Sequence, residues 1–144
     1  MCGVDNACGL QLSLYYDAET VKTAFTIPQR FAGYGGMAHG GVVAAVLDEV
    51  MAWAANCAAR GGTATGEMTL RYRKPVPVET PIAAEGRVVS QRGRIYETEA
   101  ELTGGGAVLA SAKAVFIRPL KDMLDGDAVD FVYKEGDLRL FEDL

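Results

Sequence analysis

The chain has 144 residues, 49% of them hydrophobic and 23% charged, which predicts one globular domain and excludes a disordered chain. The net charge of −5 comes from one segment: residues 1–120 carry eleven acidic and eleven basic side chains, whereas residues 121–144 carry eight and three. A neutral domain with an acidic extension argues against nucleic acid and anionic membrane as partners.

The first two predicted strands lie near the N-terminus. Apolar and polar residues alternate over residues 10–14 and again over residues 21–27, which is the pattern of half-buried strands. Residues 17–20 separate the two segments and are expected to form the turn of a hairpin. Pro28 is expected to end the second strand, because proline has no N–H to offer a neighbouring strand.

One long helix is predicted over residues 42–59, which are rich in alanine and contain neither glycine nor proline. Asp48, Glu49 and Asn56 make its centre too polar for a membrane span. Residues 61–62 are both glycine and are expected to end the helix.

Four more strands are predicted after the helix, with prolines and glycines between them, over residues 68–72, 82–88, 96–102 and 108–117. The element order is then β-β-α-β-β-β-β. Short connections favour antiparallel pairing, and a helix that is apolar nearly all round must be covered on most sides. The predicted fold is therefore of the α+β class, a curved antiparallel sheet wrapped around one long central helix.

A glycine-rich segment, residues 33–41, precedes the helix. Residues 33–38 match a G-x-G-x-x-A dinucleotide fingerprint, but they do not directly follow a strand and no second βαβ unit is present. No Gly-Lys-Ser/Thr follows, which excludes a P-loop. The glycines either form a tight turn into the helix, or expose the amides of its first turn to an anion or a developing oxyanion.

Residues 39–49, HGGVVAAVLDE, resemble the H-G-G-x6-[DE] signature of hotdog-fold acyl-CoA thioesterases, and are most similar to the phenylacetate-pathway branch. The predicted element order over residues 10–118 is also similar to that fold. The resemblance implies a hotdog thioesterase domain, which we assign to residues 1–120. The charge distribution assigns residues 121–144 to an acidic C-terminal extension, which the resemblance does not explain. The resemblance also implies an acyl-CoA substrate, so coenzyme A comes with the substrate and no separate cofactor is expected.

The same resemblance implies catalytic roles for three residues. Asp48, nine positions after the histidine, corresponds to the catalytic carboxylate. Gly40 corresponds to the glycine whose N–H binds the thioester oxygen, and Thr65 to a hydroxyl residue that helps to place water. Several relatives carry Asn or Gln six residues before the histidine, where this chain has Gly33.

Other residues near the signature admit more than one role. The single histidine, His39, is placed in the catalytic group, and a helix-cap or loop-fixing role is favoured there over that of a base. Gly41 and Tyr34 are expected to contact the substrate, and Tyr34 or Gln29 could replace the missing amide donor. Glu49 is expected to be structural.

The phosphates of coenzyme A need cations or amides. The candidate side chains are Arg71, Arg73, Lys74, Arg87, Arg92, Arg94, Lys113 and Arg118. A solvated outer face of the sheet accounts for most of them, and Arg92-Gly93-Arg94 is the favoured phosphate-binding turn. Trp53 and Met51 are candidates for the acyl pocket, or for the core.

Gly40 and Asp48 are eight residues apart on one helix, about 12 Å along its axis. A carboxylate and an oxyanion donor must both lie within about 3 Å of the reacting atoms, so one helix cannot supply both. Two antiparallel helices that meet across a two-fold axis would bring Asp48 of one subunit to Gly40 of the other. The sequence therefore predicts a homodimer with two shared sites, and the resemblance implies the same arrangement, often as a dimer of dimers.

Three functions fit these residues. The first is thioester hydrolysis, in which Asp48 either activates water or attacks the carbonyl to form an anhydride. The second is a non-catalytic acyl-CoA-binding or sensor protein. The third is an acyl-thioester dehydratase or hydratase, which is disfavoured because the Asp/Glu-x4-His pattern is absent.

Composition also bears on metals and location. No metal site is expected, because the chain has one histidine and three cysteines without zinc-ligand spacing. No basic, apolar leader begins the sequence, so a reducing, cytoplasmic location is expected.

Overall fold

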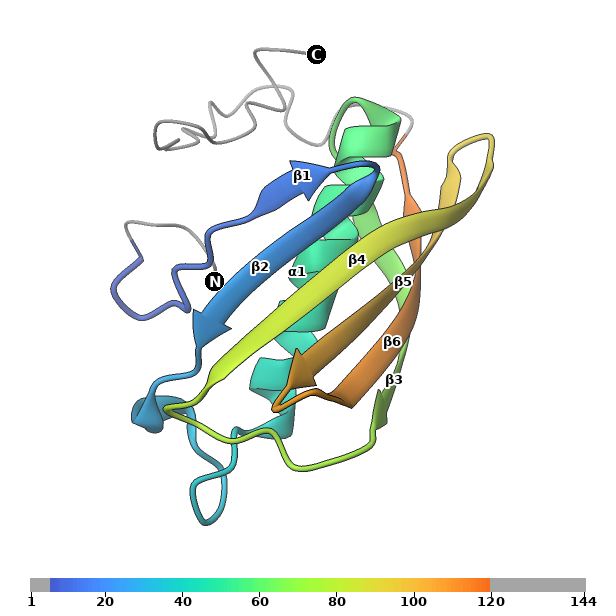
Figure 1. The fold of residues 1–144 in the computed structure, drawn as a ribbon. Helices are drawn as coiled ribbons and strands as arrows, with labels where there is room; N and C mark the ends of the chain where they lie inside the picture. The colour runs from blue at the N-terminus through green and yellow to red at the C-terminus, as the bar shows by residue number, and fades with distance from the viewer. Residues whose placement is uncertain (1–5, 120–144) are drawn as a thin grey trace.

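The computed structural model describes residues 6–119, so the acidic extension predicted over residues 121–144 lies outside the described part. The elements in chain order are β1 (Tyr15–Asp17), β2 (Thr20–Thr26), a 3₁₀ turn η1 (Gln29–Phe31), α1 (Gly40–Ala59), β3 (Ala64–Tyr72), β4 (Pro81–Arg92), β5 (Ile95–Gly104) and β6 (Ala107–Ile117). Figure 1 shows the strands crossing α1 at a slant.

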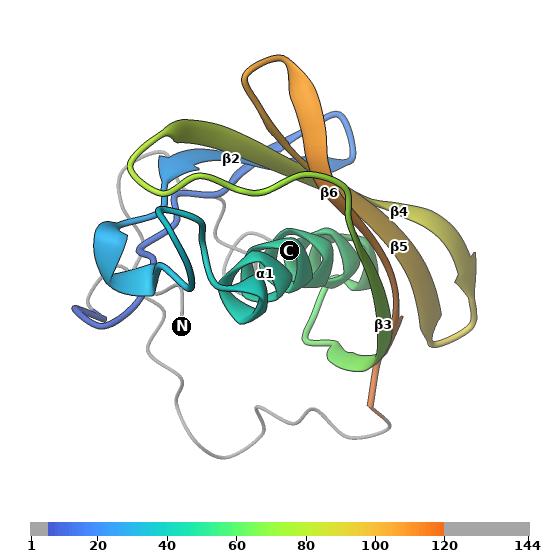
Figure 2. The same cartoon turned by 90° about the horizontal axis from the view of Figure 1, so that it is seen from below.

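All six strands form one antiparallel sheet with the order β1-β2-β4-β5-β6-β3. Seen nearly end-on, α1 lies in the concave side of this sheet (Figure 2). This arrangement confirms the α+β class and the curved antiparallel sheet around one helix. β3 follows α1 in the chain but pairs with β6 at the far edge, so residues 73–80 carry the chain back across the sheet to β4.

The helix supplies the centre of the core. Leu47, Met51 and Phe116 are among the largest fully buried side chains, so Met51 belongs to the core. By length and composition α1 could cross a membrane, but half of its apolar stretch is buried inside the protein, as expected for a core helix. Its opposite side is only half-buried and carries mostly small or polar residues: Ala44, Ala45, Asp48, Ala52 and Asn56.

The prediction of a first strand over residues 10–14 is wrong. Residues 10–14 lie outside the sheet, and the segment that pairs with β2 is the following one, β1. Gln11 has a φ of 49°, a left-handed conformation that interrupts an extended strand. The alternation still reflects burial, because Leu10 and Leu12 belong to the core. The predicted turn over residues 17–20 is confirmed by the β1–β2 hairpin.

The helix begins two residues before its predicted start and ends at Ala59 as predicted, but with a different residue as its C-terminal cap. Gly40 and Gly41 are its first two residues, because His39, directly before them, is the N-terminal cap. At the other end Arg60, with a φ of 50°, takes the left-handed position that glycine usually occupies. Residues 61–62, which were expected to end the helix, lie just beyond this cap.

The remaining strand predictions are confirmed, with longer strands than expected. Residues 68–72, 82–88, 96–102 and 108–117 lie inside β3, β4, β5 and β6 respectively. Pro81 was expected between strands but is the first residue of β4, opposite Thr26. Proline is tolerated at the first position of a strand, where its missing N–H costs little.

The helix comes very close to the sheet at Gly86 of β4. A Cβ atom at this position would lie 2.9 Å from the carbonyl carbon and oxygen of Val50, which real side chains do not tolerate. The glycine therefore allows the two backbones to approach, and it sets the depth at which α1 lies against the sheet.

Candidate active site

The start of α1 is organised by His39. Its backbone is extended, and its Nδ1 accepts a 3.0 Å hydrogen bond from the Gly41 N–H, so the predicted cap role is confirmed. Its own N–H donates to the Phe31 carbonyl at 2.9 Å, which fixes the path of the chain into the helix. No acidic side chain lies in the first turn, so nothing there neutralises the positive end of the helix dipole.

The Gly40 N–H is a free donor at this helix start. Within residues 6–119 it has no hydrogen-bond acceptor. Gly40 lines a hollow of about 320 Å³, whose walls are mostly apolar and include Tyr34, Met37, Val43, Tyr72, Pro75 and Val76. Lys74 is the cation among the described residues that line it. A free amide beside an apolar hollow is suited to bind an oxygen that gains negative charge.

Asp48 lies about two turns further along α1 and is half-buried. Its Oδ1 accepts a 3.0 Å hydrogen bond from the Thr65 hydroxyl, so the structure brings these two predicted site residues together. A bulge at Gly66 makes this possible, because the pairing with β6 skips one residue between Thr65 and Glu67. Without it, strand alternation would turn Thr65 to the same face as Thr69, away from the helix.

Asp48 and Gly40 do not meet within one chain. The eight helical residues between them correspond to about 12 Å along the axis. Asp48 lies on the half-buried side of α1, with Ala45 and Ala52 in the adjacent turns. In the described chain this side of the helix is therefore not closed by the sheet.

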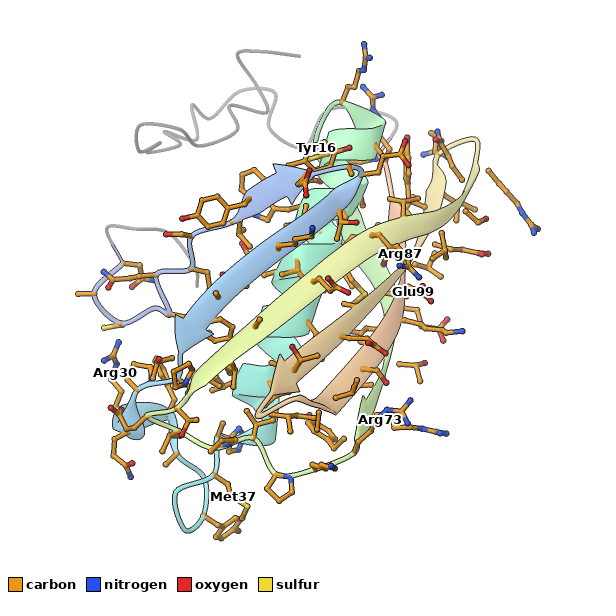
Figure 3. All side chains as sticks on the ribbon, in the orientation of Figure 1. Tyr16, Arg30, Met37, Arg73, Arg87 and Glu99 are labelled. Carbon is orange, nitrogen blue, oxygen red and sulfur yellow. The ribbon has the colours of Figure 1, made fainter. Side chains whose placement is uncertain are left out.

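The other predicted residues near the signature differ in whether they line this hollow. Tyr34 lines the hollow and is 84% exposed, whereas Gln29 and Gly41 are absent from its lining. The Gly41 N–H is already bonded to the cap. A Cβ at Gly33 would lie 3.3 Å from the Cα of His39, so this tight backbone leaves little room for a larger side chain. Figure 3 shows Met37, which also lines this hollow, on the loop that precedes α1.

The turn over residues 92–94 is far from Gly40 in the same chain. It joins β4 to β5 and lies near the C-terminal end of α1, opposite the end where the helix begins (Figure 1). The Arg94 guanidinium donates to the Arg118 carbonyl at 2.9 Å, and Arg118 donates to the Ala59 carbonyl at 3.0 Å. These bonds tie the turn to the last residue of the helix.

Glu49 has surroundings different from those of its neighbour Asp48. Its Oε1 accepts a 3.0 Å hydrogen bond from the indole N–H of Trp53, one turn later. Trp53 is partly buried and packs against the core. The contact is consistent with the structural role expected for Glu49.

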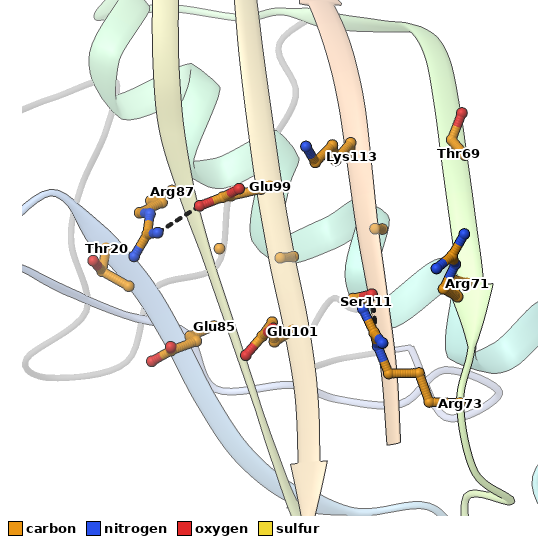
Figure 4. A pocket seen from close by; sticks show the side chains of 13 residues that line it. Thr20, Thr69, Arg71, Arg73, Glu85, Arg87, Glu99, Glu101, Ser111 and Lys113 are labelled. Carbon is orange, nitrogen blue, oxygen red and sulfur yellow. Dashed lines mark hydrogen bonds and ion pairs between the residues drawn. The ribbon is translucent and has the colours of Figure 1, made fainter. Parts of the chain in front are cut away.

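A larger hollow, of about 470 Å³, lies on the outer face of the sheet (Figure 4). Charged side chains of both signs line it, among them Arg71, Arg73, Glu85, Arg87, Glu99, Glu101 and Lys113. Arg87 and Glu99 form an ion pair there, and Figure 3 shows both on the face turned away from α1. None of the residues in the signature lines this hollow, so its size does not make it the candidate site.

Tyr72 is a hydrogen-bonding residue of the candidate site that sequence reasoning missed. It lines the hollow beside Gly40, and its hydroxyl donates a 2.7 Å hydrogen bond to the Gly40 carbonyl. Strand alternation placed it on the same face as Met68 and Leu70, which was the one available signal. The alternation does not reveal which part of the helix that face meets.

The cysteine near the helix end is not an activated nucleophile. Burial raises the pKa of the Cys57 thiol from 9.0 to about 11, and a backbone hydrogen bond opposes this only in part. The thiol is therefore protonated at neutral pH. Among residues 6–119, no group of three or more His, Cys, Asp or Glu side chains is arranged to hold a metal ion.

Sequence comparison identifies the family. The profile of the thioesterase superfamily matches residues 35–111, which is more than half of the chain. The chain therefore belongs to the thioesterase superfamily. The matched region contains Gly40, Asp48 and Thr65. A search of curated proteins found no match.

Solved structures share the architecture. A thioesterase superfamily protein of 28% identity superposes with a TM-score of 0.75 over 81% of this chain and 61% of its own, so this chain spans about three-fifths of that relative. A thioesterase superfamily protein from Shewanella loihica PV-4 has 24% identity and a TM-score of 0.65, over 75% of this chain and 90% of its own. The E. coli PaaI protein from the phenylacetic acid degradation operon has 18% identity and a TM-score of 0.71, over 80% and 86%. These similarities confirm the predicted hotdog fold.

Proposed function

We propose that this chain hydrolyses a small-to-medium acyl or aryl thioester of coenzyme A to the free acid and coenzyme A. The observation that carries the proposal is the free Gly40 N–H at the start of α1, beside a mainly apolar hollow. The positive end of a helix stabilises the oxyanion that forms when a thioester carbonyl is attacked. Apolar walls suit an acyl or aryl group.

The proposed enzyme is a homodimer whose α1 helices lie antiparallel across a two-fold axis. Asp48 is about 12 Å along the helix from its own Gly40, so its carboxylate would serve the Gly40 of the partner subunit. The half-buried side of the helix supports this arrangement, because Ala44, Ala45 and Ala52 leave room for a second helix to approach closely. A dimer of dimers is compatible with the same pairing.

The proposed reaction consumes one water. Asp48, held by Thr65, either removes a proton from the water that attacks the thioester carbon, or attacks that carbon itself to give an anhydride that water then hydrolyses. In both routes the carbonyl oxygen becomes negative beside the Gly40 N–H. The carbon–sulfur bond then breaks, and the thiolate of coenzyme A leaves and takes up a proton.

The arginine turn supports coenzyme A binding across the dimer. With Asp48 opposite Gly40, the C-terminal end of the partner helix lies about 16 Å beyond Gly40, because eleven further residues each add about 1.5 Å. The turn tied to that end would present Arg92 and Arg94 of the partner subunit to the phosphates. Lys74, at the hollow, offers a nearer cation.

A panel of short, long and aryl acyl-CoA thioesters with a thiol reagent tests the function. We expect thiol release by the wild-type protein, and loss of about a thousandfold in kcat for Asp48→Asn, which keeps the shape but cannot accept a proton. The Asn variant should still bind the thioester, which calorimetry would measure. Unchanged turnover in Asp48→Asn would contradict the proposed site.

The second candidate is a non-catalytic acyl-CoA sensor. Gly33 favours it, because glycine has no amide side chain that could assist Gly40 from that position. The same panel separates the two functions: binding of acyl-CoA without thiol release by the wild-type protein would identify a sensor. Addition of water to an enoyl thioester would instead identify a hydratase.

A further inference from the structure

We propose that Tyr72 positions the oxyanion donor Gly40, an inference that rests on the thioesterase function proposed above. Tyr72 is the last residue of β3, at the edge of the sheet, and Gly40 is the first residue of α1. The 2.7 Å hydrogen bond from the Tyr72 hydroxyl to the Gly40 carbonyl joins these two element ends across 32 positions of sequence. Both residues line the same hollow.

The peptide unit between Gly40 and Gly41 is held at both ends by side chains. Its oxygen accepts the hydrogen bond from Tyr72, and its N–H donates to Nδ1 of His39 at 3.0 Å. A planar peptide that is bonded at both ends cannot turn about its flanking bonds without losing one of the two hydrogen bonds. The plane of this peptide is therefore held by β3 on one side and by the helix cap on the other, in addition to its place in the first turn of α1.

This anchor controls the direction of the free donor. The Gly40 N–H belongs to the preceding peptide, and only the φ and ψ angles of Gly40 separate it from the anchored one. Glycine has no Cβ to restrict these angles, and here two glycines follow each other at the helix start. An oxyanion donor is effective when it is oriented before the reaction. The hydrogen bond from the Tyr72 hydroxyl therefore restrains backbone angles that the two glycines by themselves leave less restricted.

Gly40 and Tyr72 also fit each other in size. A Cβ at position 40 would lie 3.1 Å from the Tyr72 hydroxyl oxygen, closer than most Cβ contacts. A methyl group at position 40 therefore presses on the hydroxyl, whereas removal of the hydroxyl makes room for it. The effects of the two substitutions should consequently be coupled.

Tyr72→Phe tests the role with little risk to folding, because Tyr72 is 54% exposed and keeps its ring in this variant. We expect kcat to fall about tenfold with KM changed less than twofold, since a displaced donor weakens the transition state and not substrate binding. Amide hydrogen exchange at Gly41 should become faster. Tyr15→Phe, which removes another exposed hydroxyl, is the matched control and should change neither kcat nor exchange.

A double-mutant cycle completes the test. Gly40→Ala should lower kcat about tenfold beside Tyr72 and less than twofold beside Phe at position 72. Additive effects, or an unchanged kcat in Tyr72→Phe, would overturn the positioning role while leaving the thioesterase function intact. Absence of thiol release by the wild-type protein would overturn the proposed function, and this inference with it.

Discussion

The Thr65 hydroxyl donates a 3.0 Å hydrogen bond to Oδ1 of Asp48, and this bond joins the start of β3 to the middle of α1. Within residues 6–119, Oδ2 of the same carboxylate has no hydrogen-bond partner. One oxygen is thus held in place and the other is available to act on water or on a carbonyl carbon.

Thr65 is expected to orient the carboxylate rather than to react. Thr65→Val removes the hydroxyl at nearly constant shape and should lower kcat about tenfold, because the carboxylate is no longer held. Thr65→Ser keeps the donor and should retain most of the activity. Steady-state kinetics on the best acyl-CoA would measure both, and equal losses in the two variants would contradict this role.

Two inactive variants should restore activity when mixed. Gly40→Pro removes the N–H and adds a Cβ, and it should leave the helix intact, since proline suits the first position of a helix and the extended His39 suits the residue before proline. A mixed dimer of one Gly40→Pro subunit and one Asp48→Asn subunit has one intact shared site, made of Asp48 from the first subunit and Gly40 from the second. After subunit exchange of equal amounts, about a quarter of wild-type activity should return.

The control for this mixing experiment is Gly40→Ala, which keeps the N–H and adds the same Cβ. It should be markedly more active than Gly40→Pro on its own. Each variant must first be shown to be dimeric by sedimentation. No recovery of activity despite verified subunit exchange would show that one chain holds the complete site.

The arginine turn should affect binding of coenzyme A without affecting chemistry. Arg92→Ala together with Arg94→Ala should raise KM for acyl-CoA about tenfold and leave kcat nearly unchanged, because the phosphates lose cationic partners. The same acyl group on N-acetylcysteamine has no phosphates and serves as the control substrate. An equal rise of KM for both substrates would point to a structural effect of the turn.

Substitution by valine should change the stability of the protein in opposite directions at two buried threonines. The Thr23 hydroxyl is buried and has no hydrogen-bond partner, so Thr23→Val should raise the free energy of unfolding by about 1 kcal/mol. The Thr98 hydroxyl donates to the Ala114 carbonyl at 3.2 Å, so Thr98→Val should lower it by about 1 kcal/mol. Urea unfolding of the two variants against the wild-type protein would measure both changes.

Stability should fall at alkaline pH through Cys57. Its thiol has a pKa of about 11 in the folded protein against an ordinary value of 9.0, so between these pH values the unfolded chain loses the proton first. Unfolding should therefore become easier as pH rises from about 9 towards about 11, with no such effect below about 9. Urea unfolding at several pH values should show a shallower decline for Cys57→Ala, and an identical decline would exclude this cause.

Alanine-rich composition predicted the helix, and hydrophobic periodicity predicted most of the strands because burial alternates along a strand. It failed over residues 10–14, where Leu10 and Leu12 are buried without belonging to a strand. Alternation reports which side chains are buried, whereas strand pairing also requires an extended backbone. The left-handed Gln11 breaks that second condition, and side-chain polarity carries no signal of it.

The candidate site was predictable only in part, for a related reason. The family resemblance pointed to Gly40, Asp48 and Thr65, but simple alternation from Met68 would have turned Thr65 outward. The bulge at Gly66 corrects this, and a glycine inside a strand is its only sequence trace. The partner of Gly40 could not be foreseen, because contact with Tyr72 depends on β3 lying at the far edge of the sheet.

The absence of a side chain at Gly86 has a mechanical consequence. Val50 rests on that position, two residues beyond Asp48 and ten beyond Gly40. Any larger residue would push α1 away from the sheet at Val50, and Asp48, two residues earlier, would move with it. A strand residue that touches neither proposed catalytic group thereby influences the position of the catalytic carboxylate.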